Sequence, residues 1–304
     1  MSAVGGKAEV TRAGTRLPFL TRSGRTATAP SFLDGEEIAL RALNLDHYGG
    51  GPMKAAVLVS AIAVVLTSTI VDAAEIRFLH TTAIKPAVDE LVPLFEAKTG
   101  NKVAASYGPA GAIVQRVRSG EAFDVVIATN SQIADLEKQG LVVEGTKRDL
   151  AKVGIGVYVK KGATKPDVST VDRFKQALLK ANAIAYIDPA SGGASGIYIS
   201  GLLTRLGIAE ELKLKTRSPK VVAEVFDSVA SGQADLGLGQ LSEIVIDPRI
   251  ELAGMLPQEI QNITLFAVGV SSKTQDREAA GALVRFLAAP TSQGAFKKFG
   301  FEKP

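Results

Sequence analysis

The chain has 304 residues, of which 46% are hydrophobic and 22% charged, and its 35 Lys and Arg against 31 Asp and Glu give a net charge of +4. The charges are scattered, so no basic block indicates a nucleic-acid partner. The absence of cysteine rules out a disulfide framework and leaves a zinc site of the usual His/Cys kind without support.

The first informative segment is 53–74, MKAAVLVSAIAVVLTSTIVDAA, which has the order of a secretory signal. Lys54 precedes an apolar run, and small residues surround the expected cleavage at Ala73 or Ala74. The run is shorter than the about 20 residues that a transmembrane helix needs, so cleavage is favoured over an uncleaved anchor. No cysteine can form a lipobox. We therefore expect a periplasmic protein, secreted by a cleaved signal peptide.

Residues 1–52 precede this signal, where none is expected, and they are rich in Arg, Gly and Thr without a long apolar period. They are either a disordered leader or the result of a start-site error. We favour the second interpretation, in which translation starts at Met53 and the working protein begins near Glu75.

Beyond the signal, strand-like and helix-like patterns alternate to the end of the sequence. In chain order they predict strand 76–80, helix 84–98, strand 102–107, helix 111–119, strand 124–128, helix 131–139, strand 153–160, helix 172–180, strand 183–187, helices 197–206 and 221–230, strands 234–238 and 263–270, and helices 276–288 and 291–298. Such alternation predicts an α/β fold with a mostly parallel sheet covered on both faces. We expect two lobes, with 75–153 plus 267–304 in lobe 1 and 154–266 in lobe 2.

The sequence carries few signatures of catalysis. It has no Gly-x-Ser-x-Gly elbow, no phosphate-binding P-loop and no dinucleotide fingerprint. Asp and Glu are plentiful, but nothing pairs them for acid–base work, and most are expected at the solvated surface. The prediction is therefore a protein that is not an enzyme and that holds no metal and no cofactor.

Three loops of small residues stand where a predicted strand ends and a helix begins: His80-Thr81-Thr82-Ala83, Gly108-Pro109-Ala110-Gly111, and 191–196, Ser-Gly-Gly-Ala-Ser-Gly. Ligands of open α/β sheets bind beyond the carboxyl ends of strands, where helix N-termini offer free N–H groups. Each loop alone could be a cap or a turn, with Thr81-Thr82 or Ser195 as N-cap. Together they predict a cleft for a small anion.

The residues of 75–301 resemble the periplasmic molybdate-binding proteins of ABC importers, within the bilobed type II substrate-binding class. The resemblance is carried by TTAIKPAVDELVPLFEAKTG, VAASYGPAGAIVQRVRSGEAFDVVIATN, IAYIDPASGGASGIYISGLLTRLGI and VVAEVFDSVASGQADLGLGQLSEI. It implies two lobes joined by a hinge of two crossing strands, which close on the ligand.

In that family the oxyanion is held by hydroxyls and backbone N–H groups from both lobes. Here Ala110 stands where the family usually has a serine, and Gln240 where a tyrosine is common, although Gln240 can donate through its amide. The ligand-binding residues that the resemblance implies are Thr81, Thr82, Gly108, Ala110, Gly111, Ser195, Gly196, Val221 and Gln240. His80 is either a structural residue, which we favour, or a cleft donor that would make binding pH-dependent.

The resemblance implies an exported binding protein that delivers a molybdate- or tungstate-like oxyanion to an ABC permease with its ATPase. The expected protein is a monomer that meets the membrane only through the permease and binds no nucleic acid. Two alternatives stay open. The same fold could bind a small organic carboxylate, as the departures at Ala110 and Gln240 suggest, or the cleft could belong to an exported sensor or enzyme.

Overall fold

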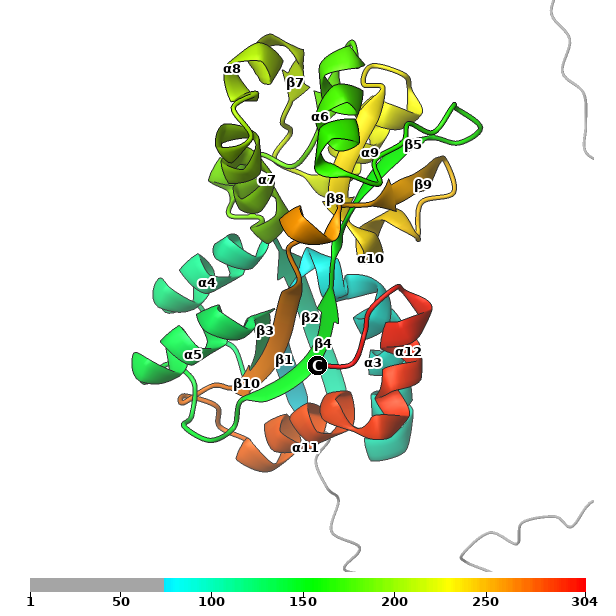
Figure 1. The fold of residues 1–304 in the computed structure, drawn as a ribbon. Helices are drawn as coiled ribbons and strands as arrows, with labels where there is room; N and C mark the ends of the chain where they lie inside the picture. Colours follow the sequence, from blue (N-terminus) through cyan, green and yellow to red (C-terminus); the bar gives the residue numbers. More distant parts are fainter. Residues whose placement is uncertain (1–73) are drawn as a thin grey trace, which may run out of the picture. The chain divides into compact units, whose positions relative to one another are not determined.

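The computed structural model describes residues 74–304, so the leader and nearly all of the predicted signal segment lie outside the described residues. The described part contains two five-stranded sheets with helices on both faces of each (Figure 1). We call each sheet with its helices a lobe. Within 74–304, no helix combines the length and apolar character needed to cross a membrane.

The sheet of the first lobe has the strand order β2-β1-β3-β10-β4. Its strands are β1 (Glu75–Thr81), β2 (Lys102–Gly108), β3 (Val125–Thr129), β4 (Arg148–Val153) and β10 (Thr264–Val270). Helices α4 (Ala110–Arg118) and α5 (Asn130–Lys138) cover one face, and α3 (Lys85–Thr99), α11 (Arg277–Ala288) and α12 (Gln293–Lys298) cover the other. The short 3-10 turns η1 (Thr82–Ile84) and η5 (Pro290–Ser292) lie before α3 and α12.

The sheet of the second lobe has the order β7-β6-β8-β5-β9. Its strands are β5 (Ile155–Lys160), β6 (Ile184–Ala185), β7 (Thr216–Arg217), β8 (Leu236–Gln240) and β9 (Ile250–Met255). Helices α6 (Val171–Lys180), α7 (Ala194–Arg205) and α8 (Ala209–Leu212) pack on one face, and α9 (Val222–Ala230) and α10 (Leu241–Ile244) on the other. Three 3-10 turns complete the lobe: η2 (Pro189–Ser191), η3 (Lys213–Lys215) and η4 (Gln258–Ile260).

Two segments cross between the lobes, one from β4 to β5 through Gly154 and one from η4 to β10. The Gln261 side chain joins them: its Oε1 accepts the N–H of Ile155 at 2.8 Å and its Nε2 donates to the Ile155 carbonyl at 3.0 Å. A Cβ on Gly154 would lie 2.8 Å from the Met255 side chain and 3.2 Å from the Gln261 side chain, so a larger residue at this crossing would require both side chains to move. The two-lobed α/β fold with two crossing strands is confirmed.

The prediction of a mostly parallel sheet is correct only in part, because each of the two sheets is mixed and contains one strand that opposes the others. Strand β10 runs antiparallel to both β3 and β4, and β5 runs antiparallel to both β8 and β9. These are the two strands that carry the chain between the lobes. Strand β5 follows the first crossing into the second sheet, and β10 follows the second crossing back into the first sheet. Each of these two strands therefore enters its sheet from the side of the other lobe, and it runs opposite to the strands on either side of it.

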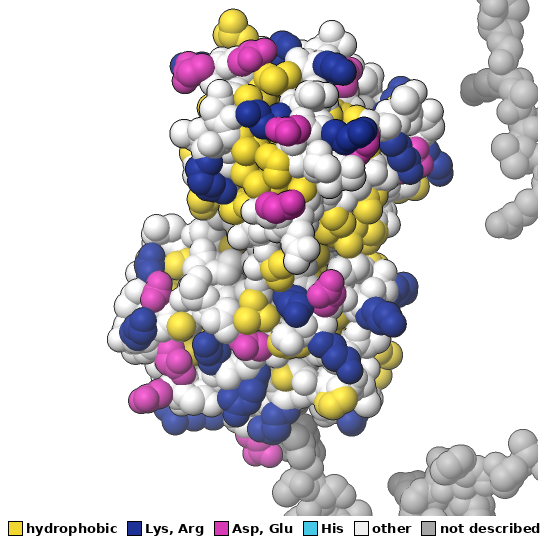
Figure 2. All heavy atoms as spheres, in the orientation of Figure 1, with side chains coloured by type: hydrophobic (Ala, Val, Ile, Leu, Met, Phe, Trp, Pro, Cys, Tyr) yellow, Lys and Arg dark blue, Asp and Glu magenta, His cyan; other side chains and the backbone are white. Residues whose placement is uncertain are grey.

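The single strand predicted over 153–160 is two strands, β4 and β5, which belong to different sheets and meet at Gly154. The division into lobes at residues 153 and 266 stays a prediction; all of β10, from Thr264, pairs in the first sheet. On the face drawn in Figure 2, positive and negative side chains are interspersed over both lobes, in keeping with the small net charge.

Candidate functional site

A pocket of 20 Å³, the inner pocket, lies between the lobes where strands end and helices begin. The first lobe contributes Thr81, Thr82, Ala83, Pro109, Ala110 and Phe266, and the second contributes Ile187, Gly193, Ala194, Ser195, Val222, Gln240 and Glu243. It adjoins a cavity of 940 Å³, the outer cavity, with which it shares Thr82, Pro109, Val222 and Glu243. The inner pocket is small and the outer cavity is large, and the four shared residues place them next to each other.

Three helices begin at the inner pocket: α4 at Ala110, α7 at Ala194 and α9 at Val222. No side chain caps the first N–H groups of these three helices. Elsewhere among residues 74–304, side chains cap α5 by Thr129, α6 by Thr170 and α11 by Asp276, whereas α3, α8, α10 and α12 also lack a side-chain cap. Free N–H groups and the positive end of the helix dipole favour an anion. The inner pocket is therefore suited to one small negative group.

Five of the residues predicted for the site come together in the inner pocket: Thr81, Thr82, Ala110, Ser195 and Gln240. Neither capping alternative describes these loops, because Thr81 makes no capping bond and the N-cap of α7 is Gly193 rather than Ser195. Two more predicted residues, Gly108 and Val221, line the outer cavity. That these residues contact a ligand stays a prediction.

Gly111 and Gly196, which were predicted to bind the ligand, line neither the inner pocket nor the outer cavity. The Gly111 N–H already donates to the carbonyl of Gly192 in the other lobe at 2.9 Å, and a Cβ on Gly111 would lie 2.8 Å from the Gly192 Cα. A Cβ on Gly196 would lie 2.3 Å from the Ile187 carbonyl oxygen. Both glycines permit close backbone contact, the first between lobes and the second within one.

His80 is a core residue and does not line the inner pocket or the outer cavity. Its Nδ1 lies 3.2 Å from the Thr81 carbonyl, and its ring packs between those of Phe78 and Tyr107. Burial lowers the pKa of His80 to about 4, so the ring is neutral above mildly acidic pH. This geometry fits the structural interpretation and gives His80 no direct route to a ligand.

Glu243, a residue that the sequence analysis did not single out, lies at the junction of the two pockets. It is 7% exposed, although nearly all Asp and Glu were expected at the surface. Burial raises the pKa of the Glu243 carboxyl from 4.5 to about 7, against an opposing interaction with the Gln240 backbone. One signal could have found it: Glu243 stands in the apolar run Leu241 to Ile246, directly after a predicted buried strand.

Further polar groups are buried near Glu243. The Gln240 Nε2 donates to Thr264 Oγ1 at 3.1 Å, so one of its two N–H groups is already used. The Tyr158 hydroxyl on β5 is buried without a hydrogen-bond partner among residues 74–304. Tyr158, Ser195 and Glu243 all line a third cavity of 10 Å³, the rear cavity, directly behind the inner pocket. The buried part of the site is thus rich in hydrogen-bonding groups.

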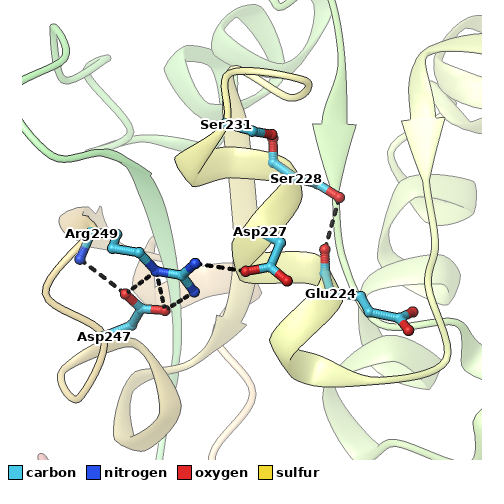
Figure 3. Close-up of polar contacts among 6 residues, drawn as sticks. All are labelled: Glu224, Asp227, Ser228, Ser231, Asp247 and Arg249. Carbon is cyan, nitrogen blue, oxygen red and sulfur yellow. Dashed lines mark hydrogen bonds and ion pairs between the residues drawn. The ribbon is translucent and has the colours of Figure 1, made fainter. Parts of the chain in front are cut away.

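The rim of the outer cavity carries charges that are largely paired. Lys85 pairs with Asp89 on α3. Arg249 binds Asp247 at 2.6 Å and Asp227 at 2.7 Å (Figure 3), and these hydrogen bonds raise the pKa of Arg249 and lower that of Asp247. No ion pair of Lys220, which also lines the cavity, is found within 74–304.

Comparison with known proteins shows which proteins this chain resembles in sequence. A family model described as bacterial extracellular solute-binding protein matches residues 76–302. The aconitate isomerase of a Pseudomonas species is 34% identical over 251 residues, covering 79% of this chain and 94% of that protein. The molybdate-binding protein ModA of Azotobacter vinelandii is 27% identical, covering 80% of this chain and 96% of that protein.

The solved structure of the Azotobacter vinelandii periplasmic molybdate-binding protein has the same fold, with a TM-score of 0.63 at 20% identity over 75% of this chain and 99% of that chain. The resemblance to molybdate-binding proteins that the sequence motifs indicated is confirmed. Because the family model spans most of the chain and nearly all of both lobes, the protein belongs to the family of bacterial extracellular solute-binding proteins.

Proposed function

We propose that this protein binds a small organic acid with more than one carboxylate, and that it does so in the periplasm. One observation carries the proposal: the inner pocket, which is suited to one small anionic group, adjoins a cavity of 940 Å³ with which it shares four lining residues. A cavity of this size lies at the upper end of the about 300–1,000 Å³ that is typical of small-molecule sites. A tetrahedral oxyanion would leave nearly all of it unfilled.

In this proposal one carboxylate occupies the inner pocket and accepts hydrogen bonds from the N-termini of α4, α7 and α9 and from the Thr82 hydroxyl. Each charge-assisted hydrogen bond contributes about 1.5–3 kcal/mol. The rest of the ligand extends into the outer cavity, toward Lys85 and Lys220. Ala110 in place of a serine and the tie between Gln240 and Thr264 reduce the donors that an oxyanion would need on all its faces.

The 34% identity to a protein named aconitate isomerase supports a ligand of this class, because aconitate is an unsaturated tricarboxylate. The test is calorimetric titration of the purified protein with cis-aconitate, trans-aconitate and citrate, and separately with molybdate, tungstate and sulfate. We expect a tricarboxylate to bind more tightly than every oxyanion. Tight binding of molybdate with no binding of the three organic acids would contradict the proposal.

A molybdate- or tungstate-like oxyanion is the second candidate ligand. It is favoured by the convergence of three uncapped helix N-termini on a pocket of only 20 Å³, and by the similarity to molybdate-binding protein ModA. The same titration decides between the two, since the buried pocket accepts either group but only the organic acid also uses the outer cavity.

For the role of binding, we propose delivery to an ABC permease with its ATPase, which the family membership supports. Enzymatic turnover competes with delivery, because one relative carries the name of an isomerase. The two roles are separated by incubating each bound acid with the protein and identifying the acid afterwards. An unchanged ligand would leave delivery as the role of binding, and an isomerised ligand would show turnover in addition to binding.

A further inference from the structure

We propose that Glu243 removes a proton from a bound unsaturated polycarboxylate and returns it, so that the pocket isomerises this ligand as well as binding it. The inference rests on the proposed function, because it requires an organic acid in the inner pocket. It goes further by assigning the activity and the group that performs it.

The position of Glu243 is the first argument. It is the only acidic residue that lines the inner pocket, and it also lines the outer cavity and the rear cavity. A ligand with one carboxylate at the helix N-termini and its carbon chain in the outer cavity passes this side chain. The carboxyl group of Glu243 therefore lies where the carbon chain of the ligand would pass from the inner pocket to the outer cavity.

The second argument is the hydrogen bonding of this region. The carboxyl group of Glu243 is buried, and the Gln240 backbone is the protein group that interacts with it. The Tyr158 hydroxyl, which has no hydrogen-bond partner among residues 74–304, lines the rear cavity together with Glu243. Buried polar groups normally have partners, so an unpartnered hydroxyl beside this carboxyl indicates a polar group supplied by a ligand.

The protonation of Glu243 suits the task. Burial brings its pKa to about 7, and a general acid–base group works best when its pKa lies near the operating pH. The titratable groups around Glu243 come from several elements: Tyr158 from β5, Tyr107 from β2, Lys85, Asp89 and Glu90 from α3, Lys220 before α9, and Asp247 with Arg249 after α10. Lys85 pairs with Asp89 and Arg249 with Asp247, so these charges largely compensate one another.

The step balances without any other reactant. Aconitate has a CH₂ group next to its carbon–carbon double bond. Glu243 takes one proton from this CH₂: the C–H bond breaks, an O–H bond forms, and the electron pair spreads over the former double bond and its carboxylates. The weakened double bond can then rotate or shift by one carbon. Glu243 returns the proton to carbon, which gives the other isomer and restores the carboxylate.

The charge that develops on the ligand carboxylate during this step lies where α4, α7 and α9 begin. Fixed N–H groups aimed at developing negative charge are among the strongest contributors to enzymatic rate enhancement. The same helix ends that bind the anion would therefore also stabilise the intermediate. This is how a binding cleft could acquire a reaction with one added carboxyl group.

The test follows cis-aconitate and trans-aconitate by proton NMR in D₂O with the full-length protein, alongside calorimetry of both acids. We expect interconversion of the isomers, deuterium at the carbon to which the proton is returned because the proton held by Glu243 exchanges with D₂O, and a rate that rises with pH through about 7. In Glu243→Gln the rate should fall at least about 100-fold while the acid still binds. The exposed Glu259→Gln is the matched control and should keep the rate.

Each outcome decides. Binding without isomerisation or deuterium exchange in the unaltered protein would overturn the inference and leave the proposed function standing. Failure of both acids to bind would overturn both. Isomerisation at the full rate by Glu243→Gln would remove Glu243 from the step. If that variant does not fold, a pH-independent rate in the unaltered protein would contradict the assignment instead.

Discussion

The buried carboxyl of Glu243 should make the ligand-free protein less stable as the pH rises. Most carboxyl groups in proteins have the opposite effect, because their pKa is lowered in the folded state. Its pKa is about 7 in the folded protein against an ordinary 4.5. Below pH 4.5 the group is protonated in both states and has no effect. As the pH rises, the unfolded chain ionises first and is favoured. The free energy of unfolding should therefore fall by about 3 kcal/mol by the time the pH exceeds 7.

Glu243→Gln removes this dependence while keeping the size of the side chain. The assay is urea unfolding of both proteins at pH 5 and at pH 8, where roughly 2–3 kcal/mol of the effect falls. Relative to the unaltered protein, the variant should gain this amount between the two pH values. Glu259→Gln, at an exposed position, should gain nothing. Equal pH dependence in the unaltered protein and in Glu243→Gln would refute the reasoning.

The comparison of the two proteins is needed because His80 acts in the opposite direction. Its pKa is lowered to about 4 by burial, so its contribution is fully present above pH 6.5 and is lost as the pH falls toward 4. Over pH 4.5–6.5 the two contributions nearly cancel in the unaltered protein. Only the difference between the protein and its variant isolates Glu243.

Three further changes test the geometry of the site. Gly111→Ala places a Cβ 2.8 Å from the Gly192 Cα and should hold the lobes apart. Calorimetry should then show at least tenfold weaker ligand binding. The control Gly294→Ala, whose Cβ would have no atom within 4 Å, should bind the ligand normally. Thr82→Val removes a hydroxyl from the inner pocket and should weaken ligand binding by about 1.5 kcal/mol. The urea midpoint of the ligand-free protein should not fall. An unchanged affinity would mean that this hydroxyl does not contact the ligand. Tyr158→Phe removes a buried hydroxyl without a partner, so urea unfolding should show equal or slightly higher stability, and a loss above about 1 kcal/mol would mean that the hydroxyl is satisfied in solution.

The sequence predicts the fold well wherever local pattern and burial agree. The β-branched run over 125–129 is a central strand with four fully buried residues, and α5 begins where a Thr129 cap and Gln132 form a capping box. The small-residue loops at Thr82, Ala110 and Ser195 were expected to converge, and they do. Parallel strands that end at one edge bring the loops at Thr82 and Ala110 together, whereas Ser195 comes from the second sheet and reaches them through the packing of the two lobes.

Other features depend on contacts that no local pattern contains. The run 153–160 reads as one strand because Gly154 interrupts it for one residue only, and the interruption matters because Met255 and Gln261 pack against that glycine. The direction of β10 and β5 depends on which sheet each strand joins. Glu243 looks like an ordinary helix-end acid in the sequence; its burial comes from the approach of both lobes around it.

The central claim is that one carboxylate of an organic acid sits at the N-termini of α4, α7 and α9 while the rest of the ligand occupies the outer cavity. The most direct measurement is a crystal structure of the protein with trans-aconitate. The account predicts a carboxylate of the ligand within hydrogen-bond distance of the N–H groups of Ala110, Ser195 and Val222, with its carbon chain next to Glu243. A crystal in which molybdate fills the inner pocket under the same conditions while trans-aconitate fails to enter it would contradict the account.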